Sequence, residues 1–104
     1  MFYINTHFYN ATLNVHTYRD TVINDSVVKM PLRYVIVQLF QTKEDLEANR
    51  DQVVAGQTDA NGDVSFFHLT SDYYYLRGWH YLYGVQMGQA ATPDKSVIDT
   101  ELDY

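Results

Sequence analysis

The feature that most constrains this chain is a two-residue alternation of apolar and polar side chains, which recurs in short runs along its length. Leu13 and Val15 follow it near the start, and Val35, Val37 and Leu39 repeat it later. Successive side chains of a β-strand point to opposite faces of the sheet, so this period gives each strand one apolar face. The pattern predicts an all-β domain in which each sheet buries one face.

Turn-forming residues separate about seven such strands at intervals typical of a β-sandwich. The expected strands cover residues 12–18, 34–40, 52–58, 63–69, 73–77 and 96–102. Residues 79–87 are expected to carry on from 73–77 in extended form, with bends or bulges at Gly78, Gly84 and Gly88. A small hairpin can form around Asn24-Asp25-Ser26. We therefore expect an Ig-like sandwich of two packed sheets.

The segment 42–50 differs from the rest because it has helical character. Thr42 can cap a helix, and Asp45 follows three residues later, as in a capping box. A helix of about two turns is marginal on its own in water. We expect it to be a short crossover between two strands.

Length, charge and cysteine content limit the class of protein. The chain has 104 residues, which fits one domain over 1–104 and leaves no room for a second. It has no cysteine, which excludes disulfides and thiolate metal sites. Its formal charge of −6 disfavours nucleic acid or an anionic membrane as the main partner. No apolar run reaches the roughly 18 residues that a transmembrane helix needs.

Three runs of residues together resemble a known family. They are Ala11–Val15; Val35–Phe40 followed by Gln41–Asp45; and Gly56–Leu69 followed by Tyr74-Tyr75-Leu76. The last run is the most specific, with the spacing Thr58-Asp59-x-x-Gly62-x-x-x-Phe66-x-x-Leu69. The chain resembles the carboxypeptidase regulatory-like domains, which have a prealbumin (transthyretin)-like β-sandwich, and the related B-type repeats of collagen adhesins. The likeness covers about 11–78, with an extra strand at about 96–102, and departs from the family where Asp20 to Leu32 replaces a short turn.

The resemblance implies a non-catalytic module of a bacterial secreted, periplasmic or cell-surface protein. On that basis we expect an exported protein whose signal peptide has been removed, because the first residues lack the basic and apolar regions of such a signal. A lone domain of this kind favours a role as a small accessory or structural subunit of a larger envelope assembly, with a protein as its partner.

Residues 73–83 are the most suggestive stretch, because aromatic side chains occupy both faces of an expected strand. Tyr74 and Leu76 are expected in the core, with the Tyr74 hydroxyl reaching a backbone group. The predicted partner-binding residues are those expected on the outside: Tyr73, Tyr75, Arg77, Trp79, Tyr81 and Tyr83. Two other readings stay open. Either the loops at 20–32 and 43–51 cover these aromatics, or Trp79, Tyr81 and Tyr83 stack against a glycan.

Patterns for metal binding are weaker. The run Asp59-Ala60-Asn61-Gly62-Asp63 begins like a calcium loop, but its glycine is fourth and Thr70 stands twelfth, so a hairpin turn is favoured. The four histidines, His7, His16, His68 and His80, lack the spacing of metal ligands, although strands can bring the last three together.

Catalytic patterns are weaker still. The 5-hydroxyisourate hydrolases share the prealbumin-like fold, but this chain lacks their tyrosine–arginine–glycine–serine ending. An activity that depends on His7 or Arg77 is a distant alternative. The first strand also has no lysine for the isopeptide bond that adhesin repeats can form. We therefore expect a non-enzymatic protein with no catalytic residues, no metal site and no cofactor.

Overall fold

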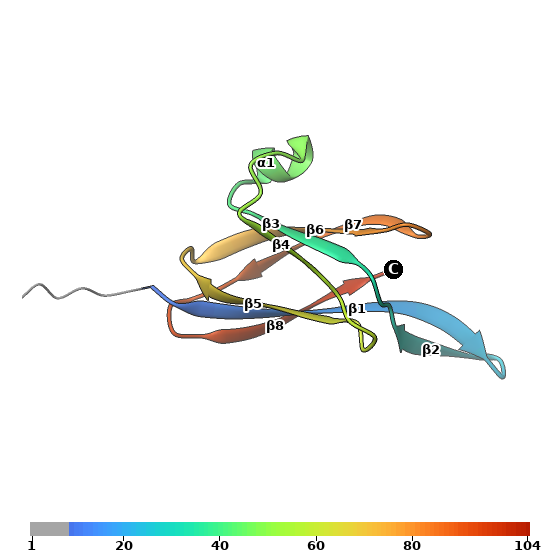
Figure 1. Cartoon of the computed structure of the whole chain (residues 1–104). Helices are drawn as coiled ribbons and strands as arrows, with labels where there is room; N and C mark the ends of the chain where they lie inside the picture. Colours follow the sequence, from blue (N-terminus) through green and yellow to red (C-terminus); the bar gives the residue numbers. More distant parts are fainter. Residues whose placement is uncertain (1–8) are drawn as a thin grey trace, which may run out of the picture.

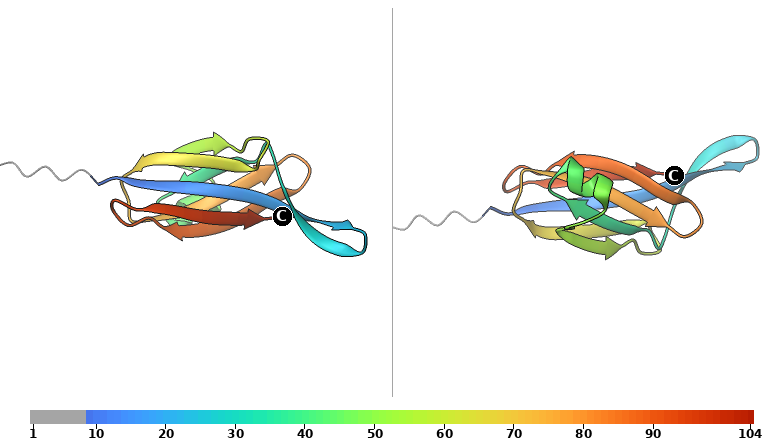
Figure 2. Two further views of the ribbon diagram at one scale, coloured as in Figure 1. Left: turned by 90° about the horizontal axis from the view of Figure 1, so that it is seen from below. Right: turned by 90° about the horizontal axis from the view of Figure 1, so that it is seen from above.

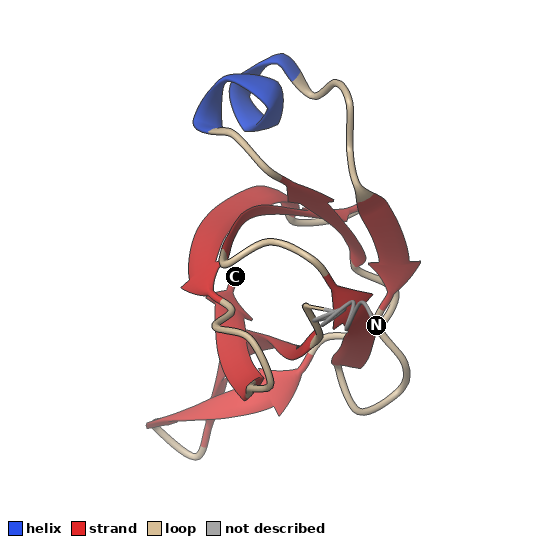
Figure 3. Ribbon diagram, turned by 90° about the vertical axis from the view of Figure 1, so that its left-hand side faces the viewer, coloured by secondary structure: helices blue, strands red, loops and turns tan. Residues whose placement is uncertain are grey.

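Two four-stranded sheets packed face to face make up most of residues 9–104, the part of the chain that the computed structural model describes (Figure 1). The first sheet contains β1 (Ala11–Ile23), β2 (Ser26–Pro31), β5 (Asp63–Leu69) and β8 (Val97–Asp103). The second sheet contains β3 (Ile36–Phe40), β4 (Val54–Gln57), β6 (Tyr73–His80) and β7 (Gly84–Ala91), and the short helix α1 (Lys43–Ala48) lies on its outer side. Seen end-on, the two sheets curve around a shared interior (Figure 3). The predicted all-β sandwich with one short helical crossover is confirmed.

Strand β1 pairs with different neighbours along its two halves. Its first part pairs antiparallel with β5 and parallel with β8, so that Leu13 lies opposite Phe66 on one side and Ile98 on the other. Its second part runs past the sandwich and pairs with β2 in a projecting hairpin (Figure 2). Asn24 and Asp25 turn this hairpin with φ of 50° and 63°, a conformation that short polar side chains tolerate. The predicted small hairpin is present, as a regular two-stranded extension.

The inner faces of both sheets carry the apolar positions that the alternation predicts. Fully buried side chains from three segments meet between the sheets: Leu13, Val15, Val35, Val37, Leu39, Tyr74 and Leu76. The hydroxyl oxygen of Tyr74 accepts hydrogen bonds from the backbone N–H groups of Thr70 (3.2 Å) and Ser71 (3.1 Å). Tyr74 therefore fills the core and has its polar tip satisfied, as predicted.

Strand β5 contains a bulge that the alternation alone does not reveal. Phe66 and Leu69 are both buried, although a spacing of three should place them on opposite faces. His68 between them has a φ of 57°, and the three residues from Ala11 to Leu13 of β1 lie opposite the four residues from Phe66 to Leu69 of β5. The extra residue on β5 resets the alternation, so Leu69 returns to the core.

The expectation that residues 79–87 continue the preceding strand is wrong. Strand β6 ends at His80, a turn occupies residues 81–83, and β7 returns antiparallel from Gly84. The turn works because Gly84 has a φ of 79°, which a side chain would strain, and because the backbone N–H of Leu82 donates to Nδ1 of His80 (3.1 Å). The stretch is thus a hairpin at the far side of the second sheet.

Gly78 and Gly88 are regular strand residues and not bends. A Cβ placed on Gly78 would lie 2.7 Å from both Leu102 Cδ1 and the Tyr104 hydroxyl, and one on Gly88 would lie 3.0 Å from Leu102 Cδ2. The two glycines therefore make room for the last strand where it crosses the second sheet.

The turn before β5 is closed by its own aspartate, but it joins β4 of the second sheet to β5 of the first, so the two strands do not form the predicted hairpin. Oδ1 of Asp59 accepts hydrogen bonds from the backbone N–H groups of Asn61 (2.9 Å) and Asp63 (3.1 Å). Gly62 adopts a φ of 76°. Asp59 Oδ1 thus serves the turn itself, and the turn carries the chain from one sheet to the other.

Helix α1 begins at its predicted cap. The Thr42 side chain accepts a hydrogen bond from the Asp45 backbone N–H (3.1 Å). The helix packs against β3 and β6 and buries Leu46, and Phe40 at the end of β3 is fully buried outside the main core. A small second cluster therefore covers one end of the outer face of the second sheet.

Candidate interaction surface

The side chains of strand β6 alternate strictly between the inner and the outer side of the sheet. Tyr74, Leu76, Gly78 and His80 are buried on the inner side, and the four residues between them face outward: Tyr73, Tyr75, Arg77 and Trp79. No register shift occurs at Gly78, because β6 pairs without interruption with β3 and β7. Four of the six predicted partner-binding residues thus lie on the outer face of the second sheet.

Two of these four residues lie beside helix α1. The rings of Tyr73 and Tyr75 meet edge to face with centroids 5.3 Å apart, and both side chains are half-buried. A hollow of about 590 Å³ between α1 and the β6–β7 strands is lined by Leu46, Tyr75 and Met87, among others. Residues of the 43–51 segment thus lie beside Tyr75, whereas most of 20–32 projects away as a hairpin (Figure 2) and only its base, at Pro31 and Leu32, lies near Tyr81 and Tyr83.

The other half of this face carries a row of exposed apolar side chains. Ile36 on β3, Trp79 on β6 and Val85 on β7 lie opposite one another across three strands, and Met87 lies next along β7 on the same face. Their exposed fractions are 41%, 40%, 39% and 53%, in that order. We call these four residues the outer apolar patch. Cross-strand neighbours hold them in a fixed arrangement on a rigid sheet.

Polar side chains border the patch on one side. Arg77, which lies opposite Met87, donates a hydrogen bond from Nη1 to Oε1 of Gln38 on β3 (3.1 Å). An apolar centre with a polar margin that contains an arginine has the composition typical of protein interfaces. Sequence reasoning identified Trp79 and Arg77 but missed Val85 and Met87, because their position depends on the unrecognised β6–β7 hairpin.

Tyr81 and Tyr83 lie in the turn at the end of the sheet, apart from the outer face. The His80 ring stacks against both of them, with centroids 4.7 Å from Tyr81 and 5.0 Å from Tyr83. The guanidinium carbon of Arg19, at the base of the projecting hairpin, is 5.6 Å from the Tyr83 ring centre. The six predicted residues thus divide between two neighbouring regions.

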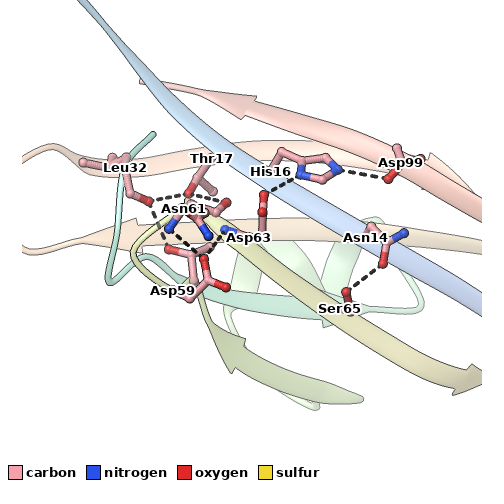
Figure 4. Close-up of polar contacts among 11 residues, drawn as sticks. Asn14, His16, Thr17, Leu32, Asp59, Asn61, Asp63, Ser65 and Asp99 are labelled. Atoms are coloured by element: carbon pink, nitrogen blue, oxygen red, sulfur yellow. Dashed lines mark hydrogen bonds and ion pairs between the residues drawn. The ribbon is translucent and has the colours of Figure 1, made fainter. Parts of the chain in front are cut away.

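The centre of the outer face of the first sheet carries polar side chains that pair across strands, whereas Phe67 on β5 and Val97 on β8 are exposed apolar residues nearer its end. His16 on β1 lies between Asp63 on β5 and Asp99 on β8, with Nδ1 2.6 Å from one carboxylate and Nε2 2.9 Å from the other (Figure 4). Both ring nitrogens can donate only when the imidazole is protonated. The hydrogen bonds to Asp99 and Asp63 accordingly raise the pKa of His16, against a smaller opposing effect of burial, and the His16 and Asn14 contacts lower the pKa of Asp99.

Further cross-strand pairs extend this network. Ser65 donates to Oδ1 of Asn14 (2.7 Å), and Lys29 Nζ lies 2.9 Å from Glu101 and 3.3 Å from Asp103. Hydrogen bonds to these two carboxylates raise the pKa of Lys29. Sequence reasoning missed the network because its members come from strands that are far apart along the chain.

The structure describes Arg77 and three of the four histidines that were considered for metal binding or hydrolysis. His16 faces outward from the first sheet and His80 inward from the second, and residues 9–104 contain no group of three or more histidine or acidic side chains that could hold a metal ion. Arg77 is bonded to Gln38, and His7 lies outside the described residues. No helix in the described part of the chain has the length and apolar character of a membrane span.

The sandwich is similar to one solved pilus protein. It superimposes on the crystal structure of GBS52, the minor pilin of the Gram-positive pathogen Streptococcus agalactiae, with a TM-score of 0.67 and 16% sequence identity. The match covers 92% of this chain and 44% of that chain, so the domain spans less than half of the pilin's length. No protein-family model and no curated protein matches the sequence. At this level of identity the comparison establishes the fold.

Proposed function

We propose that this domain is a non-catalytic interaction module of a bacterial surface assembly, and that it binds a protein partner through the outer apolar patch. The observation that supports the proposal is the cross-strand row of Ile36, Trp79 and Val85, extended by Met87, on a sheet that keeps them exposed. Contiguous exposed apolar side chains on a rigid face are typical of binding sites. They add nothing to the core, which lies on the opposite side of the same strands.

The composition of the patch supports a protein as the partner. Tryptophan, methionine and arginine are enriched at interfaces, and a central tryptophan is a frequent source of binding energy. Trp79 is held between two neighbouring strands, so docking costs little of its conformational freedom. The hollow between α1 and the β6–β7 strands adjoins the patch through Met87 and provides a recess for a projecting side chain of the partner.

The likeness to a minor pilin supports the surface location. A pilin is part of an assembly of protein subunits, which fits an exported accessory or structural subunit of a surface assembly. The family proposed from the sequence, the carboxypeptidase regulatory-like and adhesin B-type domains, is in keeping with the same sandwich. Because the match spans under half of the pilin, pilus assembly itself is one form that this role can take.

Site-specific photo-crosslinking on the native cell surface tests the proposal. A photoreactive residue replaces Val85 in one variant and Ser65, on the outer face of the first sheet, in the control. The proposal expects one defined crosslinked protein from position 85, none from position 65, and loss of the product when Trp79→Ala is added. Equal products from both positions, or none from position 85, would contradict it.

A second candidate function, carbohydrate binding, is favoured by a separate observation. The Tyr81, His80 and Tyr83 rings form a stack beside Arg19 at the end of the sandwich, and the Tyr81 ring is 65% exposed. Exposed aromatic rings of this kind can serve as platforms for sugars. A glycan-array screen of the wild-type domain against the Tyr81→Ala variant tests this candidate, and equal signals on every glycan would exclude it.

A further inference from the structure

A cleft of about 390 Å³ opens at the end of the sandwich, where three segments meet. They are the base of the β1–β2 hairpin, the segment that leads into β3, and the turn between β6 and β7. The side chains that matter for its chemistry are Arg19, Arg33, Tyr34, His80, Tyr81 and Tyr83. None of the residues that line the cleft is acidic.

Two arginines give the cleft an unusual charge for this protein. The chain has 13 acidic and 7 basic residues, yet Arg19 and Arg33 both line this one cleft. Within residues 9–104 neither guanidinium has a carboxylate in ion-pair range, whereas Lys29, Lys43 and Arg50 all do. Two unpaired guanidinium groups on one concave surface form a binding site for an anionic group, and their planar forks match a carboxylate.

Aromatic rings hold these arginines and provide flat surfaces beside them. Arg19 lies 5.6 Å from the centre of the Tyr83 ring, which stacks on His80, and Arg33 lies 5.1 Å from the centre of the Tyr34 ring. Tyr34 is 50% exposed, and Tyr81 covers the His80 ring and is more exposed still. The cleft therefore combines fixed positive charge with open aromatic faces.

The framework of the cleft is ordered by buried hydrogen bonds. Nδ1 of His80 accepts a hydrogen bond from the Leu82 backbone N–H (3.1 Å), which fixes the ring against the β6–β7 turn. The Leu32 carbonyl accepts from the hydroxyls of Thr17 (2.6 Å) and Thr58 (3.1 Å), which fixes the chain between the two arginines (Figure 4). A site that is rigid before binding loses little entropy when it is filled.

We propose that this cleft binds an acidic saccharide, a pyranose that carries a carboxylate. The two guanidinium groups recognise the carboxylate, and the exposed faces of Tyr34 and Tyr81 stack on the apolar C–H face of the ring. Both features are needed: a neutral sugar lacks the charge, and a simple anion lacks the ring. The proposal rests on the second candidate function, carbohydrate binding at the Tyr81 end of the sandwich, and is independent of protein binding at the outer apolar patch.

Titration of the full chain with defined oligosaccharides, followed by NMR chemical shifts, tests this site. The probes are an oligogalacturonide and a sialyl-oligosaccharide as two sources of the carboxylate, the matching neutral galactose oligomer, and inorganic phosphate. At least one acidic saccharide should bind saturably, with shifts confined to the cleft residues, and about tenfold or more tightly than the neutral oligomer and phosphate. Which acidic probe binds identifies the source.

Matched variants separate the cleft from the general charge of the protein. Arg33→Gln and Arg19→Gln should each weaken binding about tenfold or more, whereas Arg50→Gln on the helix side should leave it unchanged. Tyr81→Ala should weaken binding while thermal unfolding stays near that of the wild type. Met87→Ala, in the outer apolar patch, should have no effect on the saccharide. Failure of both acidic probes, equal binding of the neutral oligomer or of phosphate, or insensitivity to both arginine changes would overturn the proposal.

Discussion

The two outer faces of the sandwich are built on the same strand geometry but differ in chemistry at their centres. On the first sheet, His16 and Asn14 are each tied to side chains on neighbouring strands. On the second sheet, Ile36, Trp79 and Val85 occupy equivalent outward positions and present apolar surface to solvent. Both sheets bury their inner faces in one core, so the demands of folding do not explain the difference.

This difference indicates where the molecule has uses beyond its own stability. Outward polar side chains that pair across strands add modestly to stability and keep a face in water. Outward apolar side chains gain little from the fold and raise the risk of association. A face that keeps them is best explained by a partner that covers it, and the following experiments break or sharpen that contrast.

The largest expected difference is between a substitution on the inner side of strand β6 and one on its outer side. Leu76→Ala removes a fully buried side chain and should lower the free energy of unfolding by about 3 kcal/mol. Trp79→Ala, three residues away on the outer face, should lower it by under about 1 kcal/mol because it leaves no cavity. Urea unfolding of the two variants measures both values. If Trp79→Ala lowered the free energy of unfolding as much as Leu76→Ala, Trp79 would be a core residue and the proposed difference between the two sides would be wrong.

The next largest effect concerns binding and not folding. With the crosslinked partner in hand, Trp79→Ala should weaken its affinity by about 2 kcal/mol, or about 30-fold, because a central tryptophan is desolvated on docking. The control is Ser65→Ala on the outer face of the first sheet, which should leave the affinity unchanged. Isothermal titration measures both. If the two substitutions had equal effects, the two faces would not differ in function.

A smaller effect tests how closely the last strand packs against the second sheet. Gly78→Ala places a methyl group 2.7 Å from Leu102 Cδ1 and from the Tyr104 hydroxyl, and should cost about 1 kcal/mol as these side chains shift. Gly88→Ala meets only Leu102, at 3.0 Å, and should cost less. Thermal unfolding ranks the pair. If Gly78→Ala stabilised the domain, close packing at this crossing would be refuted.

The smallest effect belongs to the polar face and depends on pH. The pKa of His16 is raised in the folded state, so its contribution is complete below the unfolded value of about 6.5 and is lost as pH rises through the folded pKa. The change should stay under about 1 kcal/mol, because the groups are partly exposed.

Urea unfolding between about pH 5.5 and pH 8.5 measures the loss in the wild type and in His16→Gln, which should lack it. The lowered pKa of Asp99 adds a separate loss at acidic pH, below its ordinary value. Identical stability profiles for the two proteins above pH 6 would show that the contacts of His16 with Asp63 and Asp99 do not contribute to stability.

Local patterns account for much of the fold. The alternation around Leu13 and Val37, the burial of Tyr74 with its hydroxyl on a backbone group, and the cap at Thr42 are all consequences of neighbouring residues. Each depends on properties that a short segment carries with it. These were the predictions that the structure confirms.

The remaining features depend on residues that meet only in three dimensions. The β6–β7 turn has no asparagine or aspartate, and only Gly84 at its end provides a signal. The bulge at His68 is set by its pairing with β1, and the contacts of His16 join three strands. The cleft with Arg19 and Arg33 is likewise assembled from three distant segments, so neither its charge nor its aromatic walls appear as a motif.

The parallel pairing of the first and last strands gives the domain a mechanical property. Residues 12–18 of β1 run side by side with 97–103 of β8, entering at one end of the sandwich and leaving at the other (Figure 2). Tension applied before β1 and after β8 therefore pulls the two strands past each other and loads their hydrogen bonds all at once. Bonds loaded in shear must break together, whereas those of a hairpin open one by one. A domain strung this way can carry force along a fibre without unravelling from its ends.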